Sequence, residues 1–374
     1  MTLDEYILLT RTLSSNSPPL EAMYAKYYKI ILSIFGNSPS LPKLKVIYSL
    51  QRSAEIIDLS GKEFLIYDQY LGQTFNMLNR ILLNSTDTMD SEMYFFKLLS
   101  ERFAVKGENK IAQLLAYMHH IMKGKYFSYK SDKDILQRAI FTYSQEVFII
   151  SHEIAHLLIE NPQNYREFFS RISFSDDFNL DNPSHFIEIV NNMSNLFGLG
   201  PIDYKGLDLI TSIFKNKLTK ELVIECYCDT IATLVTILVL NVKQNMDINN
   251  VILGIVICLR HLRVIGVIND ICSNLWEKSK ITSNDIHLTM NYIPRTSNIR
   301  GLISSFKNNF KQTVNYADIV ELADHYEIMI EDPLMLSVSD KLKTLQRSLV
   351  ENQQDIVDDA NFTLTDVIKT TGFL

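Results

Sequence analysis

Three strongly apolar runs, at residues 148–159, 230–242 and 251–268, constrain how this chain can fold. The 374 residues include only 12 Gly and 9 Pro, so long helices can continue with few interruptions. The first two runs are too short to cross a bilayer as helices, and Arg-His-Leu-Arg at 260–263 interrupts the third. The runs therefore predict buried core helices of a soluble protein, rather than membrane spans.

Hydrophobic periodicity and helix stop signals give the approximate limits of these elements. They predict helices over residues 136–160, 218–243 and 250–275. Residues 1–60 also have a helical pattern, and the best candidate for a strand is the segment 62–72, which is rich in aromatic and β-branched residues. We therefore expect a mainly α fold with at most a small β-sheet.

Charge and cysteine content narrow the classes of function. The net charge of −7 and the isoelectric point near 5.7 argue against a nucleic-acid partner, since such a protein needs a basic face. The four cysteines are few and lie in apolar helical runs, which favours free thiols in a reducing compartment. Asp4 and Glu5 stand where a signal peptide would have a basic leader. These features predict a cytoplasmic protein.

The first apolar run contains the pattern HExxH, formed by His152, Glu153 and His156. Ionisable groups are expensive to bury unless they have partners. Residues four apart share one face of a helix, so both imidazoles can reach one zinc ion, with Glu153 close to a zinc-activated water. Zinc lowers the pKa of that water, and Glu153 as general base would accept its proton. The alternative is a core helix whose histidines are satisfied by hydrogen bonds.

A third zinc ligand is expected elsewhere, because the pattern HExxHxxGxxH does not continue after His156. Glu225 and Asp229 lie four residues apart on one face of the apolar segment 221–240. A zinc ion would offset the cost of burying Glu225, and Asp229 would accept the other ring N–H of a ligating histidine. Glu160 is the second candidate for the third ligand. In the alternative interpretation, Glu225 and Asp229 face solvent.

The combination of HExxH with a later E-x-x-x-D helix resembles the gluzincin metallopeptidases over roughly residues 136–300. The resemblance implies a helical metallopeptidase core with an HExxH helix and a third-ligand helix. It implies that zinc is bound by His152, His156 and Glu225, with Asp229 supporting the ligands. The interval between the two motifs is longer than in the thermolysin-like branch, and Ile224 stands where that branch has asparagine.

The zinc motif is also similar to that of phage-exclusion proteases of the Lit type. Some bacterial intracellular peptidases with an E-x-x-x-D helix carry a later His-Pro…Arg segment. Here Ile293 stands at the histidine position, before Pro294. We expect a protein or peptide substrate. The large helical additions around the motifs suggest that this substrate is restricted, as in bacterial antiviral defence or toxin proteases.

Gluzincins add a donor that stabilises the tetrahedral oxyanion. The polar segment after the third-ligand helix supplies four candidates for this donor or for a substrate contact: His287, Tyr292, Arg295 and Arg300. The alternative is that this segment is an ordinary surface loop.

Three further features have less specific interpretations. Cys226 and Cys228 flank the third-ligand position at other helical angles, which favours buried thiols over zinc ligation. His119 and His120 are expected to be a pair on a helix surface. Residues 68–72 form either an edge strand along a substrate groove or part of a core strand.

We therefore predict a zinc-dependent endopeptidase. Its parts would be an N-terminal helical region with one short strand at 1–108, a zinc metallopeptidase core at 109–300 and a C-terminal helical tail at 301–374. Two alternatives remain open. One is a catalytically inactive interaction or regulatory protein on a metallopeptidase fold, and the other is a membrane-associated zinc protease.

Overall fold

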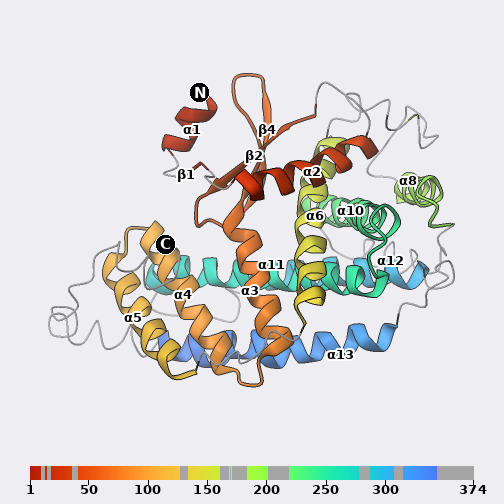
Figure 1. The fold of residues 1–374 in the computed structure, drawn as a ribbon. Helices are drawn as coiled ribbons and strands as arrows, with labels where there is room; N and C mark the ends of the chain where they lie inside the picture. Colours follow the sequence, from red (N-terminus) through yellow and green to blue (C-terminus); the bar gives the residue numbers. More distant parts are fainter. Residues whose placement is uncertain are drawn as a thin grey trace. The chain divides into compact units, whose positions relative to one another are not determined.

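The computed structural model describes residues 1–9, 13–14, 18–35, 41–126, 134–160, 168, 170, 183–200, 219–277, 287–306 and 315–342. Most of these residues are helical, and they include one small sheet, which confirms the predicted fold class (Figure 1). The chain forms two compact units. Unit 1 comprises Met1–Thr74, Ala139–Leu259 and Asn291–Tyr316, and unit 2 comprises Phe75–Arg138, Arg260–Met290 and Ala317–Leu374. The predicted boundaries after residues 108 and 300 fall inside these units.

The sheet belongs to unit 1 and has the strand order β1-β2-β4-β3. The strands are β1 (Leu13–Ser14), β2 (Lys43–Tyr48), β3 (Ala54–Asp58) and β4 (Glu63–Asp68). Strand β2 runs parallel to β4, whereas β1 and β3 are antiparallel to their neighbours. The prediction of helices in residues 1–60 is therefore confirmed at Leu3–Leu9 and Pro18–Phe35, and it is wrong where β1, β2 and β3 lie. Runs as short as β2 and β3 carry too few residues for the helical and strand periods to be distinguished.

The predicted strand at 62–72 is confirmed only in its first part, as β4. Strand β4 lies between β2 and β3, so the interpretation of residues 68–72 as an edge strand is wrong. The side chain of Asp68 explains why the strand ends there: it accepts hydrogen bonds from the backbone N–H groups of Arg52, at 2.8 Å, and Tyr70, at 3.0 Å. The second bond satisfies a free N–H in the first turn of the helix that follows.

The helices take up most of the described chain. They are α1 (Leu3–Leu9), α2 (Pro18–Phe35), α3 (Gln69–Asn84), α4 (Met89–Val105), α5 (Asn109–Tyr126), α6 (Ile135–Glu160), α8 (Pro183–Leu196), α10 (Lys220–Ile237), α11 (Ile248–Glu277), α12 (His287–Phe306) and α13 (Tyr316–Tyr326). π-Helical turns follow α10 at Leu238–Val242 and α13 at Glu327–Glu331 and Pro333–Val338. The three long helices predicted from the apolar runs correspond to α6, α10 and α11.

Two of these helical segments, Lys220–Val242 and Ile248–Ser273, are long and apolar enough to cross a membrane. Within the protein, 83% and 78% of their apolar windows are already buried. Other parts of the chain therefore cover most of the surface that a lipid-facing helix would need to expose.

Two helices, α3 and α11, pack closely against α6 at positions where each has a glycine. A Cβ atom on Gly72 of α3 would lie 2.2 Å from Glu146 Oε1, and one on Gly254 of α11 would lie 2.8 Å from Ser144 Cβ. Because a side chain at either position would collide with α6, the two glycines allow this close packing. They fix the helix shortly before its HExxH residues.

Glu146 is a buried acid at this contact. Tyr24 of α2 donates a hydrogen bond of 2.7 Å to its Oε1 atom, and Tyr67 of β4 packs against Tyr24. Burial raises the pKa of Glu146 to about 7, and the hydrogen bond from Tyr24 offsets only part of this increase. Near neutral pH, the folded protein therefore holds much of this carboxyl group in its protonated form.

We expect the contribution of Glu146 to the free energy of unfolding to decrease as the pH rises through about 7. Its folded pKa, about 7, lies above the ordinary value of 4.5, so this contribution is complete below about pH 4.5 and is lost above pH 7. The loss corresponds to roughly 3 kcal/mol. Urea unfolding of the wild type and Glu146→Gln between pH 5 and 9 measures it, because glutamine cannot ionise. A difference between the two proteins that stays constant with pH would contradict the assignment.

Candidate metal centre

Two helices of unit 1, α6 and α10, bring the predicted ligands together (Figure 1). His152 and His156 lie one turn apart on α6, and their Nε2 atoms are 3.1 Å apart. Glu225 lies in the second turn of α10, whose start is capped by the side chain of Thr219. Its Oε2 atom is 3.3 Å from His152 Nε2, and its Oε1 atom is 3.3 Å from His156 Nε2.

These separations match the coordination geometry of zinc. A tetrahedral zinc ion with bonds of about 2.0–2.1 Å holds its ligand atoms about 3.3–3.4 Å apart. The 3.1 Å between the two Nε2 atoms is close to this spacing, and so are the two 3.3 Å contacts, each of which ends on a different oxygen of Glu225. Two imidazoles and a carboxylate are also a donor set that zinc accepts in catalytic sites. The residues present thus fit a zinc ion.

Asp229 lies beside the other ring nitrogen of His152. Its Oδ1 atom is 3.0 Å from His152 Nδ1, and its side chain is completely buried. A carboxylate at this distance favours a proton on Nδ1, which leaves Nε2 as the atom able to bind a cation. The sequence predicted that Asp229 accepts a hydrogen bond from this nitrogen; the two atoms lie close together, but Nδ1 forms no hydrogen bond of standard geometry.

Arg295 of α12 contacts both carboxylates and has a different position from the one expected of an oxyanion donor. Its Nε and Nη2 atoms donate to the two oxygens of Asp229 at 2.7 Å each, and Nη1 lies 2.9 Å from Glu225 Oε2. The guanidinium is only 12% exposed, so these contacts are shielded from water. We call Asp229, Glu225 and Arg295 the carboxylate clamp.

Asn298, one turn after Arg295, also holds α12 to the third-ligand helix. Its Nδ2 atom donates to the carbonyl oxygen of Cys226 at 2.8 Å and to Thr230 Oγ1 at 2.9 Å. The sequence analysis missed Asn298, and its interpretation of this segment as a surface loop is wrong, because α12 is a helix. The polar composition of the segment had suggested a loop, and Pro294 lies inside the helix.

The clamp shifts the pKa values of the groups around it. Burial acts to raise the pKa of Glu225 and of Asp229, but the histidines and Arg295 hold both well below their usual range. Burial acts to lower the pKa of His152, but Asp229 and Glu225 raise it to about 9. A proton on His152 therefore competes with any cation for the site, and metal binding would release that proton.

Glu153 is the carboxyl group that would accept a proton from a water molecule at the cluster. Burial raises its pKa, while the two neighbouring histidines act in the opposite direction. Its side chain is half-buried, and within the described part of the chain it forms no hydrogen bond or ion pair with another side chain. Its carboxylate therefore remains available to a water molecule beside the two histidines.

The other predicted site residues lie apart from this cluster or outside the described structure. Glu160 is 3.9 Å from Nδ1 of His156, on the side of the ring away from Nε2, and its side chain is 58% exposed. Arg300 is on α12 and forms no described ion pair with the cluster. The side chains of His287 and Tyr292 lie outside the described residues. Of the four predicted oxyanion donors, only Arg295 is therefore seen in contact with the cluster, and its contacts are with the carboxylates.

Two minor predictions can be compared directly with the structure. Cys226 and Cys228 are free and buried, as expected, and burial raises the pKa of both thiols above the usual value. The expectation of a surface histidine pair is wrong for His119, which is buried with Nδ1 2.9 Å from the carbonyl oxygen of Met93. Its neighbour His120 is exposed.

Comparison with known protein families, characterised proteins and solved structures gives no match. The likeness to gluzincins is therefore confined to the two short motifs. The functional interpretation depends on the arrangement of side chains described above.

Proposed function

We propose that this chain is a zinc-dependent peptidase. The observation that carries the proposal is the convergence of His152, His156 and Glu225, whose ligand atoms all lie within 4.8 Å of one another. Two imidazoles and a carboxylate brought together from two helices in this way are a donor set that a catalytic zinc ion accepts. Glu153, one residue after the first ligand, adds the acid–base group that hydrolysis needs.

Each residue of the cluster has a definable task. His152, His156 and Glu225 would hold the ion, and Asp229 would keep Nδ1 of His152 protonated, so that Nε2 faces the ion. A bound zinc ion would supply Lewis-acid chemistry, polarising a water molecule and the substrate carbonyl. Glu153 would accept a proton from the attacking water and return it to the leaving nitrogen. Arg295 would fix the orientation of the two carboxylates.

The proposal of catalysis, rather than of an inactive scaffold, is supported by Glu153. A purely structural metal site is usually closed by a fourth protein ligand, whereas a catalytic site keeps one position open. The cluster contains three ligand groups, all within 4.8 Å of one another, and Glu153 beside them is unpaired within the described structure. A protein or peptide substrate is proposed on the basis of the gluzincin-like motifs.

We expect one zinc ion per chain in protein purified without chelators. Elemental analysis of the wild type measures the stoichiometry, and titration with a competing chelator measures the affinity. Glu225→Gln should lower zinc affinity by more than the roughly 10–100-fold typical of residues that only support ligands. Glu160→Gln is the matched control, because Glu160 is exposed and its carboxylate lies near His156, which Glu225 also contacts. Zinc loss in Glu160→Gln with retention in Glu225→Gln would show that Glu225 is wrongly assigned as the third ligand.

A further inference from the structure

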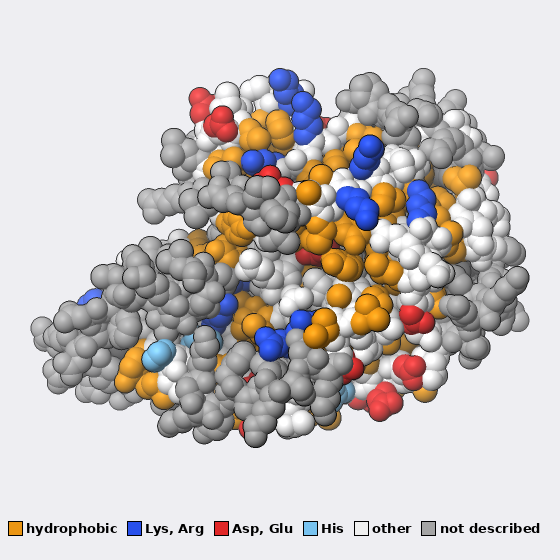
Figure 2. Space-filling view, viewed as in Figure 1, with side chains coloured by type: hydrophobic (Ala, Val, Ile, Leu, Met, Phe, Trp, Pro, Cys, Tyr) orange, Lys and Arg blue, Asp and Glu red, His pale blue; other side chains and the backbone are white. Residues whose placement is uncertain are grey.

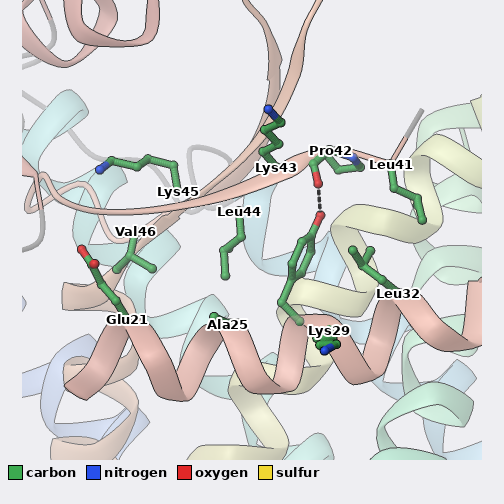
Figure 3. Close-up of a pocket in the computed structure, with 11 residues that line it drawn as sticks. Glu21, Ala25, Lys29, Leu32, Leu41, Pro42, Lys43, Leu44, Lys45 and Val46 are labelled. Atoms are coloured by element: carbon green, nitrogen blue, oxygen red, sulfur yellow. Dashed lines mark hydrogen bonds between the residues drawn. The ribbon is translucent and has the colours of Figure 1, made fainter. Parts of the chain in front are cut away.

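A second surface of unit 1, far from the metal cluster in sequence, has the features of a binding groove. It lies between helix α2 and strand β2 and encloses about 760 Å³ (Figure 3). Figure 3 shows Leu44 and Val46 of β2 projecting toward the helix, where Ala25 and Leu32 also line the space. The groove therefore has an apolar floor supplied by alternate residues of the strand and by one face of the helix.

The opposite face of the same strand is basic. Lys43 and Lys45 alternate with the floor residues and project away from α2 (Figure 3). Lys29 also lines the groove, whereas Glu21 is the single acid among the lining residues. Figure 2 shows basic side chains among hydrophobic ones in the region of α2. This local excess of lysine is the reverse of the net charge of −7 carried by the whole chain.

The backbone of β2 offers hydrogen-bonding groups along this groove. On one side, β2 pairs with β4 from Lys43 to Ile47, whereas on the other side β1 pairs only with Ile47 and Tyr48. Within the described part of the chain, no strand pairs with residues 43–46 on that second side. The carbonyl oxygen of Pro42, just before β2, accepts a hydrogen bond from Tyr28 of α2.

We propose that this groove binds an extended peptide in which acidic and apolar side chains alternate. A peptide that adds to the edge of β2 would use main-chain hydrogen bonds for affinity and alternate side chains for selectivity. Because side chains of a strand point alternately to its two faces, one set would enter the apolar floor and the other would meet Lys43 and Lys45. A lipid surface lacks the backbone N–H and C=O groups that such an edge requires. The inference goes beyond the proposed peptidase and shares no residue with its metal cluster.

Binding can be measured by fluorescence anisotropy with a labelled peptide of alternating glutamate and valine. The full chain carrying Glu153→Gln is the receptor, because it should not consume the peptide. We expect saturable binding that weakens with added salt, and weaker binding of peptides that alternate lysine with valine or glutamate with serine. Equal binding of all three peptides would overturn the proposal, and so would binding to anionic phosphatidylserine vesicles without binding to the peptide.

Charge reversal tests the position of the site. Lys43→Glu combined with Lys45→Glu should lower affinity roughly 10-fold or more, since two attractive contacts become repulsive. Lys26→Glu is the matched control, because Lys26 is an exposed residue of α2 that does not line the groove. Unchanged melting temperatures would show that both variants fold. Loss of affinity in the control alone, or in neither variant, would overturn the assignment whether or not the chain hydrolyses peptides.

Discussion

Replacing Glu153 with glutamine should abolish peptide hydrolysis while leaving zinc bound. The amide nearly matches the carboxylate in shape but cannot accept the proton of the attacking water. Loss of a general base typically lowers the rate by roughly 10²–10⁴-fold. The three ligand side chains are unchanged, and Glu153 forms no described bond to any of them, so the geometry of the cluster should persist. The expected result is therefore a large decrease in kcat with zinc content preserved.

The assay requires a substrate whose identity is not assumed. A peptide mixture from a digested proteome, incubated with the chain and analysed by mass spectrometry for new termini, meets this need. Glu160→Gln is the control, because Glu160 lies on the same helix but is 58% exposed. It should cleave as the wild type does. Equal numbers of new termini in the wild type and in Glu153→Gln would remove Glu153 from the mechanism.

Replacing Asp229 with asparagine should destabilise the folded protein by about 3–5 kcal/mol, the range for breaking one side of a buried ion pair. If Asp229 only supported a histidine ligand, its removal would weaken zinc binding with little effect on folding. The structure changes this expectation, because two nitrogens of Arg295 donate to Asp229 at 2.7 Å in a buried environment. Without the carboxylate, the guanidinium loses these two charge-assisted hydrogen bonds.

A double-mutant cycle separates the clamp from general damage to the helix. Urea unfolding in excess chelator should show that Asp229→Asn and Arg295→Met are each destabilising, and that the double variant costs less than their sum. Zinc affinity, measured on the same variants, reports the orientation of His152. A change in stability within about 0.5 kcal/mol for Asp229→Asn, as at an ordinary surface site, would contradict the buried clamp.

The parts of the site that sequence could predict are those encoded within one helix. The four-residue spacing of His152 and His156, and of Glu225 and Asp229, implies a shared helical face whatever the rest of the fold. Their chemistry then suggests that the two faces meet, and the structure brings them together. The same reasoning predicted the long core helices, because their apolar periods extend over many turns.

The features that were missed depend on contacts between distant segments. Nothing local to Arg295 or Asn298 indicates that they meet a helix about 70 residues earlier, at separations of 66 and 72 residues. The polar composition of the segment around Arg295 suggested a surface loop, whereas the structure has a helix there with Pro294 inside it. The short strands β2 and β3 are defined by their pairing with β4, and pairing is not visible in the pattern of either segment alone.

The fact that unit 1 is discontinuous along the chain affects the order in which its parts can fold during synthesis. The unit is built from three stretches of chain, and Arg295 belongs to the last of them, Asn291–Tyr316. Domains generally begin to fold as the ribosome releases them, from the N-terminus onward. Glu225 and Asp229 emerge well before their guanidinium partner, so until α12 arrives only the histidines of α6 can offset their charge. The nascent chain would therefore complete the carboxylate clamp late, after most of the protein has left the ribosome.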